Sequence, residues 1–351
     1  MLQITKKFIS FIKNPFKGKH GPLLIAEIGG NHEGNFQYAK ELAKLAIASN
    51  VDYVKFQVYT GDSLVSNLES PDRNKHFKKF ELKKNQYLEL AQMTTEKGIG
   101  FTSSVWNPES IKWIDNYMGL YKIGSGDLTA YPLLKKIAEV NKPIILSTGL
   151  SSEKEVMEAV QYIQSINPNY KSKEMLALLQ CTSMYPITPK DSHLNVMSRL
   201  KELTDLTIGY SDHTECSKAL YYATAMGAEV LEFHFTDNRK GKVFRDHKVS
   251  LTPKEVETLI EEIKLIKDYQ GVSNKQPLKI EIDHEHHISF RRAVYPSSDI
   301  RAGEKLTEDN LTILRPLHGI DARDYRKLLG KKALKDLKKH QKLNWNLIEK
   351  L

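Results

Sequence analysis

Two histidines stand at the ends of neighbouring apolar runs. His213 follows LTIGYSD (206–212), and His234 lies within VLEFHFT (230–236). If these runs are adjacent strands, both imidazoles could converge on one divalent ion. Two nitrogen ligands without a thiolate would leave positions for water or substrate oxygens, which suits Mn²⁺ acting as a Lewis acid on a carbonyl, with Mg²⁺ or Co²⁺ as alternatives. The pair therefore predicts an open catalytic metal site.

Lysines and hydroxyl groups form a second set of candidates. Lys55 and Gln57 are two residues apart in a strand-like run, so they share one face, and Val54, Phe56 and Val58 take the other. Other runs also end in polar residues: Glu27, Ser104, Lys122, Ser125 and Asp127, Ser147, the stretch 181–186 (CTSMYP), Ser211 and Glu232. A single strand lysine usually reaches solvent, but eight polar run ends in succession favour a functional site because unpaired buried charges are costly. Lysines with serines are typical of a site for phosphate and carboxylate groups.

The elements that must position these residues are eight apolar runs separated by amphipathic stretches. The runs cover 23–29, 53–59, 100–105, 120–125, 143–148, 175–181, 206–212 and 230–236, and the stretches between them have apolar residues at three- and four-residue spacing. Eight such units predict an α/β fold, a (β/α)8 TIM barrel over residues 23–271, with its chemistry at the carboxyl ends of the strands. A doubly wound open sheet is the alternative, but no GxGxxG follows the first run.

Two further segments flank the predicted barrel. Residues 1–22 form a basic N-terminal extension, and its apolar run is too short to span a bilayer. We expect a frayed end or a strand packed on the barrel rather than a helix at a membrane surface. After Gly271 a polar linker covers 272–287. Residues 288–351 have short runs interrupted by proline and glycine, which predicts a small, β-rich domain.

Composition restricts the class of protein. The 351 residues carry a formal net charge of +9, but the lysines are dispersed and no nucleic-acid-binding motif accompanies them, so the charge suits small anionic substrates better than nucleic acid. Cys181 and Cys216 cannot build a disulfide framework, which favours a reducing, cytoplasmic location without membrane insertion. No serine has the GxSxG context of a nucleophile.

Longer stretches resemble the sialic acid synthase family, the bacterial nonulosonic acid synthases. The matching stretches are IAEIGGNHEG, DYVKFQVY, YKIGSGD, ILSTGLSS, QCTSMYP, IGYSDHT and LEFHFTDNRKGKVFRDHKVSLTP. The segment RRAVYPSSDIRAGEKLTEDNLTILRPLHGI resembles the antifreeze-like (SAF, β-clip) domain that ends these enzymes. The matches run in order over nearly the whole chain after residue 22.

The resemblance implies a role for individual residues. Phosphoenolpyruvate would be held by Lys55, Gln57, Ser104, Lys122, Ser125, Ser147, Ser183 and Ser211. His213 and His234 would bind the metal, and Glu27 would lie beside the reacting carbons. The sugar would contact Asn74, Asp127, Tyr185, Asp246 and, from the partner subunit of a domain-swapped homodimer, Arg315.

The implied reaction joins phosphoenolpyruvate to an amino-sugar aldehyde and releases phosphate by C–O cleavage. Ser183, Asp127, Val105 and His318 depart from the pattern typical of N-acetylneuraminate enzymes. All except Val105 would lie on the sugar-reading side, so three acceptors stay open: N-acetylmannosamine, a diacetamido-trideoxyhexose of the legionaminic or pseudaminic routes, or another aldose. A second interpretation is a different phosphoenolpyruvate-dependent synthase, one that makes 3-deoxy sugar acids. A sugar-binding pseudoenzyme is a third, although Lys55, Lys122, His213 and His234 are all present.

Overall fold

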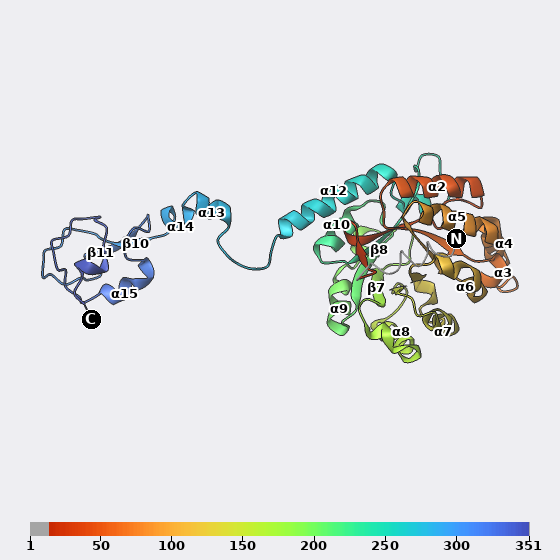
Figure 1. The fold of residues 1–351 in the computed structure, drawn as a ribbon, viewed down its shortest axis with the longest axis horizontal. Coiled ribbons are helices and arrows are strands. Elements are labelled where there is room, and N and C mark those ends of the chain that lie inside the picture. Colours follow the sequence, from red (N-terminus) through yellow and green to blue (C-terminus); the bar gives the residue numbers. More distant parts are fainter. Residues whose placement is uncertain (1–13, 351) are drawn as a thin grey trace. The chain divides into compact units, whose positions relative to one another are not determined.

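The computed structural model describes residues 14–350, and the chain divides after Gly271 into two compact units (Figure 1). Part of the predicted N-terminal extension, residues 1–13, lies outside the described residues. Each unit is described by itself.

The first unit is built on a closed barrel of eight parallel strands. In chain order they are β2 (Gly21–Glu27), β3 (Tyr53–Val58), β4 (Gly100–Val105), β5 (Tyr121–Ile123), β6 (Ile144–Ser147), β7 (Leu176–Cys181), β8 (Thr207–Asp212) and β9 (Val230–His234). Each strand pairs with the next in sequence, and β2 also pairs with β9, which closes the barrel. The predicted (β/α)8 fold is confirmed.

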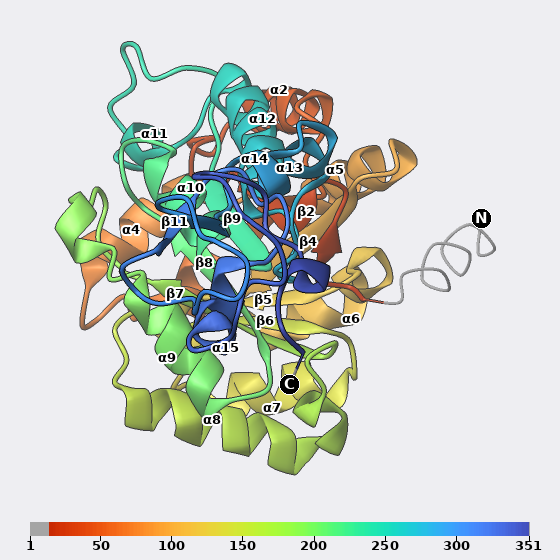
Figure 2. The ribbon, with the colours of Figure 1, turned by 90° about the vertical axis from the view of Figure 1, so that its left-hand side faces the viewer.

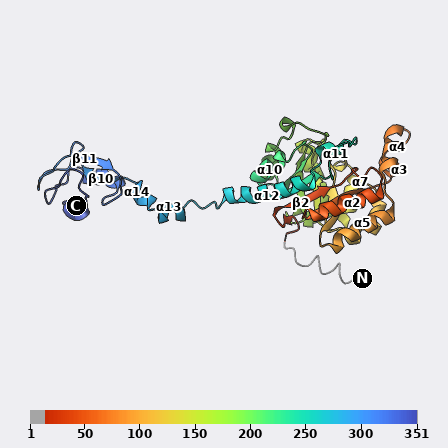
Figure 3. The same cartoon turned by 90° about the horizontal axis from the view of Figure 1, so that it is seen from above.

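Helices cover the outside of this barrel. They are α2 (Phe36–Ala48), α3 (Gly61–Leu64), α4 (Pro71–Phe80), α5 (Lys84–Glu96), α6 (Ile111–Ile114), α7 (Tyr131–Glu139), α8 (Glu153–Ile166), α9 (Asn195–Leu203), α10 (Lys218–Ala225), α11 (Asp246–Val249) and α12 (Pro253–Gln270). Figure 2 shows α7, α8 and α9 along the outer face of the strands, and Figure 3 shows α2 beside α12. Local sequence fixes several helix starts: Ser152 and Glu155 form a capping box at α8, and Thr252 and Glu255 form one at α12.

Side chains alternate between the helix layer and the barrel interior. Leu24, Ala26 and the predicted outward set of β3 belong to the large apolar cluster under the helices. Leu23 and Ile25 instead belong to a smaller cluster inside the barrel, toward the amino ends of the strands. Its other members are Leu120, Ile145, Ala177, Leu179, Val230 and Phe16. The same inward face of β2 then carries Glu27 at its carboxyl end. The interior is therefore apolar at the amino ends of the strands and polar at the other.

The described part of the N-terminal extension belongs to the barrel unit. β1 (Lys17–Gly18) pairs antiparallel with the start of β2, and Phe16 is 1% exposed inside the barrel cluster. The apolar run for which a frayed end or a packed strand was expected lies within residues 1–13, outside the described residues.

The second unit has a core of its own. It contains α13 (Lys279–Asp283), α14 (His286–Ser289), the antiparallel pair β10 (Ala293–Pro296) and β11 (Leu311–Leu314), and α15 (Tyr325–Leu328). Its apolar cluster includes Val294, Ile300, Leu306, Leu328 and Leu343. The predicted linker 272–287 thus contains α13 and the start of α14. No helix in residues 14–350 is long and apolar enough to cross a membrane.

Candidate active site

A cavity of about 710 Å³ opens at the carboxyl ends of the barrel strands. Its lining includes fourteen of the sixteen residues selected from the sequence: Glu27, Lys55, Gln57, Ser104, Lys122, Ser125, Asp127, Ser147, Ser183, Tyr185, Ser211, His213, His234 and Asp246. Strand register explains the convergence, because Glu27 lies opposite Lys55 on one neighbour and His234 on the other. These side chains therefore share one layer of the barrel.

Two lysines and two carboxylates form a buried network at the cavity floor. Lys55 Nζ lies 2.8 Å from Glu27 Oε2 and 4.0 Å from Glu232 Oε1. Lys122 Nζ lies 3.4 Å from the same Glu232 oxygen, to which Ser211 donates a hydrogen bond of 3.2 Å. Gln57 donates to Glu27 over 2.6 Å. Burying any of these charges without a partner would cost free energy, and their mutual pairing offsets that cost.

The same network shifts the pKa values of the two carboxylates in opposite directions, and it does the same for the two lysines. Burial raises the pKa of Glu27, and the neighbouring Glu232 adds to that effect against the pull of Lys55. Burial also opposes ionisation of Glu232, but Lys122 and Lys55 outweigh it and hold the pKa of Glu232 below its usual value. Burial lowers the pKa of Lys122. For Lys55, the two carboxylates overcome burial and raise the pKa. Lys55 with Glu232 is thus the more firmly charged pair, and Glu27 is the carboxyl group more disposed to carry a proton.

Hydroxyl groups line the wall beside Lys122. Its ammonium donates to Ser147 Oγ over 2.7 Å, and the backbone N–H of Gly149 donates to Ser125 Oγ over 3.0 Å. A Cβ on Gly149 would lie 2.5 Å from Ser183 Oγ and 2.8 Å from Ser125 Oγ. A methyl group at this position would displace both serine hydroxyls, so glycine keeps them in place on the wall. Ammonium, hydroxyl and N–H donors together suit a phosphate or carboxylate.

The two predicted metal ligands lie side by side. The ring centroids of His213 and His234 are 5.4 Å apart, and Tyr185 packs on His213 with a centroid separation of 4.0 Å. His213 Nδ1 lies 2.7 Å from the carbonyl oxygen of Thr182, so Nδ1 carries the proton and Nε2 keeps its lone pair. Burial lowers the pKa of both imidazoles, which keeps them neutral.

The donor set suits a metal ion with open positions. His234 Nδ1 is buried without a hydrogen-bond partner in the described residues, and it lies 4.0 Å from Asp246 Oδ2. No group of three or more His, Cys, Asp or Glu within residues 14–350 is arranged to hold a metal. His213 and His234 thus offer two neutral nitrogens, and an ion held by them would take its other ligands from water or substrate.

Comparison with known sequences assigns the chain to a family. A model described as the NeuB family matches residues 42–275, and a SAF domain model matches residues 291–349. The chain belongs to the NeuB family. The resemblance to sialic acid synthases drawn from the sequence motifs is confirmed, and this is a sialic or nonulosonic acid synthase family.

Several relatives of this NeuB-family chain match over nearly their full length. N,N'-diacetyllegionaminic acid synthase of Campylobacter jejuni is 35% identical over 335 residues, 91% of this chain and 98% of the relative. N-acetylneuraminate-9-phosphate synthase of Mus musculus is 33% identical, with 90% of each chain covered. The crystal structure of an N-acetylneuraminic acid synthetase from Leptospira borgpetersenii is 28% identical, with a TM-score of 0.68, over 76% of this chain and 90% of that one.

Two predicted site residues of this NeuB-family chain are not among the cavity lining. Asn74 is buried in α4, and its amide nitrogen lies 2.7 Å from Val65 O and 3.1 Å from Gly61 O. The amide nitrogen of Asn74 thus ties α4 to the preceding turn, and the predicted sugar contact of Asn74 stays a prediction. Arg315 belongs to the second unit, where its guanidinium lies over the Phe290 ring at 5.2 Å.

Other lining residues received no role from the sequence. Glu232 takes part in the lysine network, and its Oε2 atom is buried without a hydrogen-bond partner in the described residues. Cys181 is buried against His213, with 3.8 Å between Sγ and Nδ1. Arg245 pairs with Asp246 over 3.2 Å and covers the Tyr185 ring. The sequence could have indicated Glu232, because Glu232 and His234 are two residues apart on β9 and therefore face the same side of the strand.

Proposed function

We propose that this chain is a nonulosonic acid synthase that condenses phosphoenolpyruvate with an N-acylated amino-hexose such as N-acetylmannosamine. The observation that carries the proposal is the floor of the cavity, where Lys55, Lys122 and serine hydroxyls lie beside a pair of neutral imidazoles. Lysines and hydroxyls supply donors for the phosphate and carboxylate of phosphoenolpyruvate.

The proposed reaction forms one C–C bond and breaks one C–O bond. The methylene carbon of phosphoenolpyruvate attacks the aldehyde carbon of the open-chain sugar, and cationic character develops at the adjacent carbon. Water adds there, and the tetrahedral intermediate releases phosphate. Lys55 and Lys122 stabilise the phosphate and carboxylate charges. Glu27, which lines the cavity and whose pKa burial raises, would orient the water or move its proton.

His213 and His234 would hold the divalent ion in this proposal, with Mn²⁺ favoured over Mg²⁺ or Co²⁺. The ion would supply Lewis-acid polarisation of the acceptor carbonyl. Replacing His213 with Ala is expected to abolish product formation while the far-ultraviolet circular dichroism stays unchanged. His20→Ala, in the turn between β1 and β2, is the matched control and should retain activity. Full turnover by His213→Ala in metal-stripped buffer would contradict the metal assignment.

The acceptor is tested by a panel of sugars. Purified protein is incubated with phosphoenolpyruvate, Mn²⁺ and N-acetylmannosamine or a diacetamido-trideoxyhexose, then phosphate release and product mass are measured. We expect phosphate and a nine-carbon keto acid in equal amounts with one acceptor. The relatives named legionaminic and pseudaminic acid synthases support the second acceptor as the alternative. No phosphate release with any acceptor would reject the synthase in favour of a sugar-binding pseudoenzyme.

A further inference from the structure

The segment between β9 and α11, residues 236–245, carries a side chain over the active-site cavity. Its last residue, Arg245, covers the Tyr185 ring at 5.0 Å and pairs over 3.2 Å with Asp246, the first residue of α11. Arg245 and Asp246 both line the cavity, and Asp246 Oδ2 lies 4.0 Å from His234 Nδ1. The position of this segment therefore decides where two side chains of the cavity wall lie.

A contact of three side chains, which we call the clasp, ties this segment to α2. The Tyr38 hydroxyl donates to Asp237 Oδ1 over 2.7 Å and accepts a hydrogen bond of 2.6 Å from Lys242 Nζ. Lys242 Nζ also lies 3.5 Å from Asp237 Oδ1 and 4.3 Å from the centroid of the Tyr38 ring. Asp237 and Lys242 belong to the same segment, so a single hydroxyl of α2 fastens the segment at two points.

The charges of the clasp match the direction of its hydrogen bonds. Burial opposes the charge of Asp237, but the hydrogen bonds from Tyr38 and from the N–H of Asn238 hold the pKa of this carboxyl below its usual value. Burial also opposes the charge of Lys242, and its contacts with Tyr38 and Asp237 still raise the pKa. Burial raises the pKa of Tyr38, so the phenol keeps the proton that it donates. A phenol can bridge an ammonium and a carboxylate in this way, and a phenyl ring cannot.

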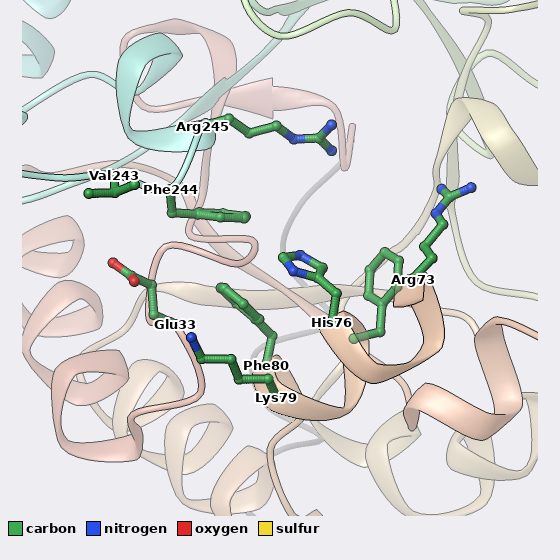
Figure 4. A pocket seen from close by; sticks show the side chains of 9 residues that line it. Glu33, Arg73, His76, Lys79, Phe80, Val243, Phe244 and Arg245 are labelled. Atoms are coloured by element: carbon green, nitrogen blue, oxygen red, sulfur yellow. The ribbon is translucent and has the colours of Figure 1, made fainter. Parts of the chain in front are cut away.

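The Phe244 ring holds the segment at a further point, directly before Arg245. Its centroid lies 4.8 Å from that of Phe80 and 6.2 Å from that of His76, both on α4. Figure 4 shows these three rings grouped together, with Arg245 extending past them. A Cβ on Gly30 would lie 2.8 Å from Phe244 Cζ, so the ring packs on the backbone that follows β2. The segment is therefore held against α2, α4 and the turn after β2.

We propose that Tyr38 is a positioning residue for the acceptor side of the active site, where the clasp fixes the places at which Arg245 and Asp246 meet the sugar. The inference rests on the proposed function, because it assigns these two side chains to the acceptor. Tyr38 is not among the residues that line the cavity, so it acts through the segment. The phosphoenolpyruvate floor at Lys55 and Lys122 stands on β3 and β5, and it does not depend on the clasp.

Tyr38→Phe isolates the hydroxyl. The ring packs against the apolar cluster under the helices, and phenylalanine keeps that packing. Loss of the two hydrogen bonds should leave the fold intact and let the segment open more often, because its outer part is exposed, with Val243 at 92%. The variant therefore changes the position of the segment rather than the stability of the barrel.

Trypsin measures this opening, because the segment contains cleavage sites after Arg239, Lys240 and Lys242. Native wild type and Tyr38→Phe are digested side by side, and mass spectrometry follows the cut after Lys240. We expect this cut to be at least fivefold faster in Tyr38→Phe, since local opening limits the cleavage of a folded chain. Tyr222→Phe removes a hydroxyl from α10 at a position that is 61% exposed, and it should be cut at the wild-type rate.

Steady-state kinetics separate positioning from general damage. N-acetylmannosamine and the diacetamido-trideoxyhexose are each assayed with phosphoenolpyruvate and Mn²⁺. For the sugar that turns over, Tyr38→Phe should raise KM at least fivefold, while KM for phosphoenolpyruvate stays within twofold of the wild type. Lys242→Gln should raise the acceptor KM similarly, and the double variant should exceed neither single variant by more than twofold, because both changes remove one contact. Tyr222→Phe should change neither KM.

The outcomes separate this inference from the proposed function. Unchanged cleavage of Tyr38→Phe overturns the clasp. Faster cleavage with an unchanged acceptor KM, or an equal rise in both KM values, overturns the positioning role while the synthase proposal stands. If neither sugar turns over, the synthase proposal fails and calorimetric binding of the same sugars decides. Binding that Tyr38→Phe weakens at least fivefold then supports the positioning role, and equal binding overturns it.

Discussion

Glu27 and Glu232 have the same side chain and similar burial, yet their pKa values move in opposite directions. Both lysines act on Glu232, whereas Lys55 alone forms an ion pair with Glu27. The sequence contains the information that both residues end barrel strands, but it does not contain the distances that divide the lysines between them. The residue types of the site were therefore predictable, and their electrostatic roles were not.

The pH dependence of stability is a prediction at this scale. His32 is 2% exposed, burial lowers its pKa to about 4, and its Nδ1 accepts the N–H of Gly34. The unfolded chain protonates His32 near pH 6.5, so between about pH 6.5 and 4 the unfolded state binds more protons and stability falls as the pH falls. His32→Asn keeps an acceptor for Gly34 and removes this titration.

Urea unfolding of both proteins from pH 7.5 to pH 4.5 measures the effect. Across this window, we expect the free energy of unfolding to fall by up to roughly 3 kcal/mol more in the wild type than in His32→Asn. Parallel losses in the two proteins would contradict the assignment, since all other groups titrate alike in both.

At the scale of elements, all eight predicted strands are present, and the ends of each differ from the prediction by two residues or fewer. The predicted run 120–125 became a shorter strand, Tyr121–Ile123, followed by a one-turn helix at Ser125–Asp127. Periodicity finds a strand because alternate residues face two different layers. Periodicity does not report tertiary contacts, which is why the hydrogen bonds of Asn74 to Gly61 and Val65 could not be read from the sequence.

The described end of the N-terminal extension gives a prediction for one element. Phe16 is 1% exposed and packs inside the barrel with Leu23 and Ile25. Phe16→Ala is expected to lower the free energy of unfolding by about 3–5 kcal/mol, because it leaves a cavity in a closed interior. Thermal or urea unfolding measures this, with Leu68→Ala as a control at a position that is 87% exposed. A loss below about 1 kcal/mol would mean that the barrel core closes without Phe16.

The whole molecule consists of two units with separate cores. We propose that the chain forms the domain-swapped homodimer that the family resemblance implies. Arg315 lies in the second unit and the metal ligands lie in the first. In a domain-swapped dimer, a site would take its barrel from one subunit and its arginine from the other. That arrangement makes Arg315→Ala and His213→Ala defects in different subunits of the same site.

Mixing the two inactive variants tests the swap. Co-refolded Arg315→Ala and His213→Ala chains form hybrid dimers in which one site receives an intact barrel and an intact Arg315, so about a quarter of all sites should regain activity. Each variant co-refolded with itself is the control. Activity that stays at the level of the separate variants would place Arg315 in the same subunit as the histidines it serves, or outside the site.

A hollow of about 630 Å³, whose lining includes Arg73, Lys79 and Arg245, is formed by α4 and the 243–245 segment, not by the strands. Arg73, Lys79 and Arg245 are exposed, and none of them belongs to an apolar cluster of the barrel. Substitutions at these three positions should therefore change which acceptor tail is preferred at little cost in folding. A combinatorial library limited to positions 73, 79 and 245 would keep the phosphoenolpyruvate floor constant. Selection from such a library could redirect this scaffold toward nine-carbon acids with unnatural substituents at the far end.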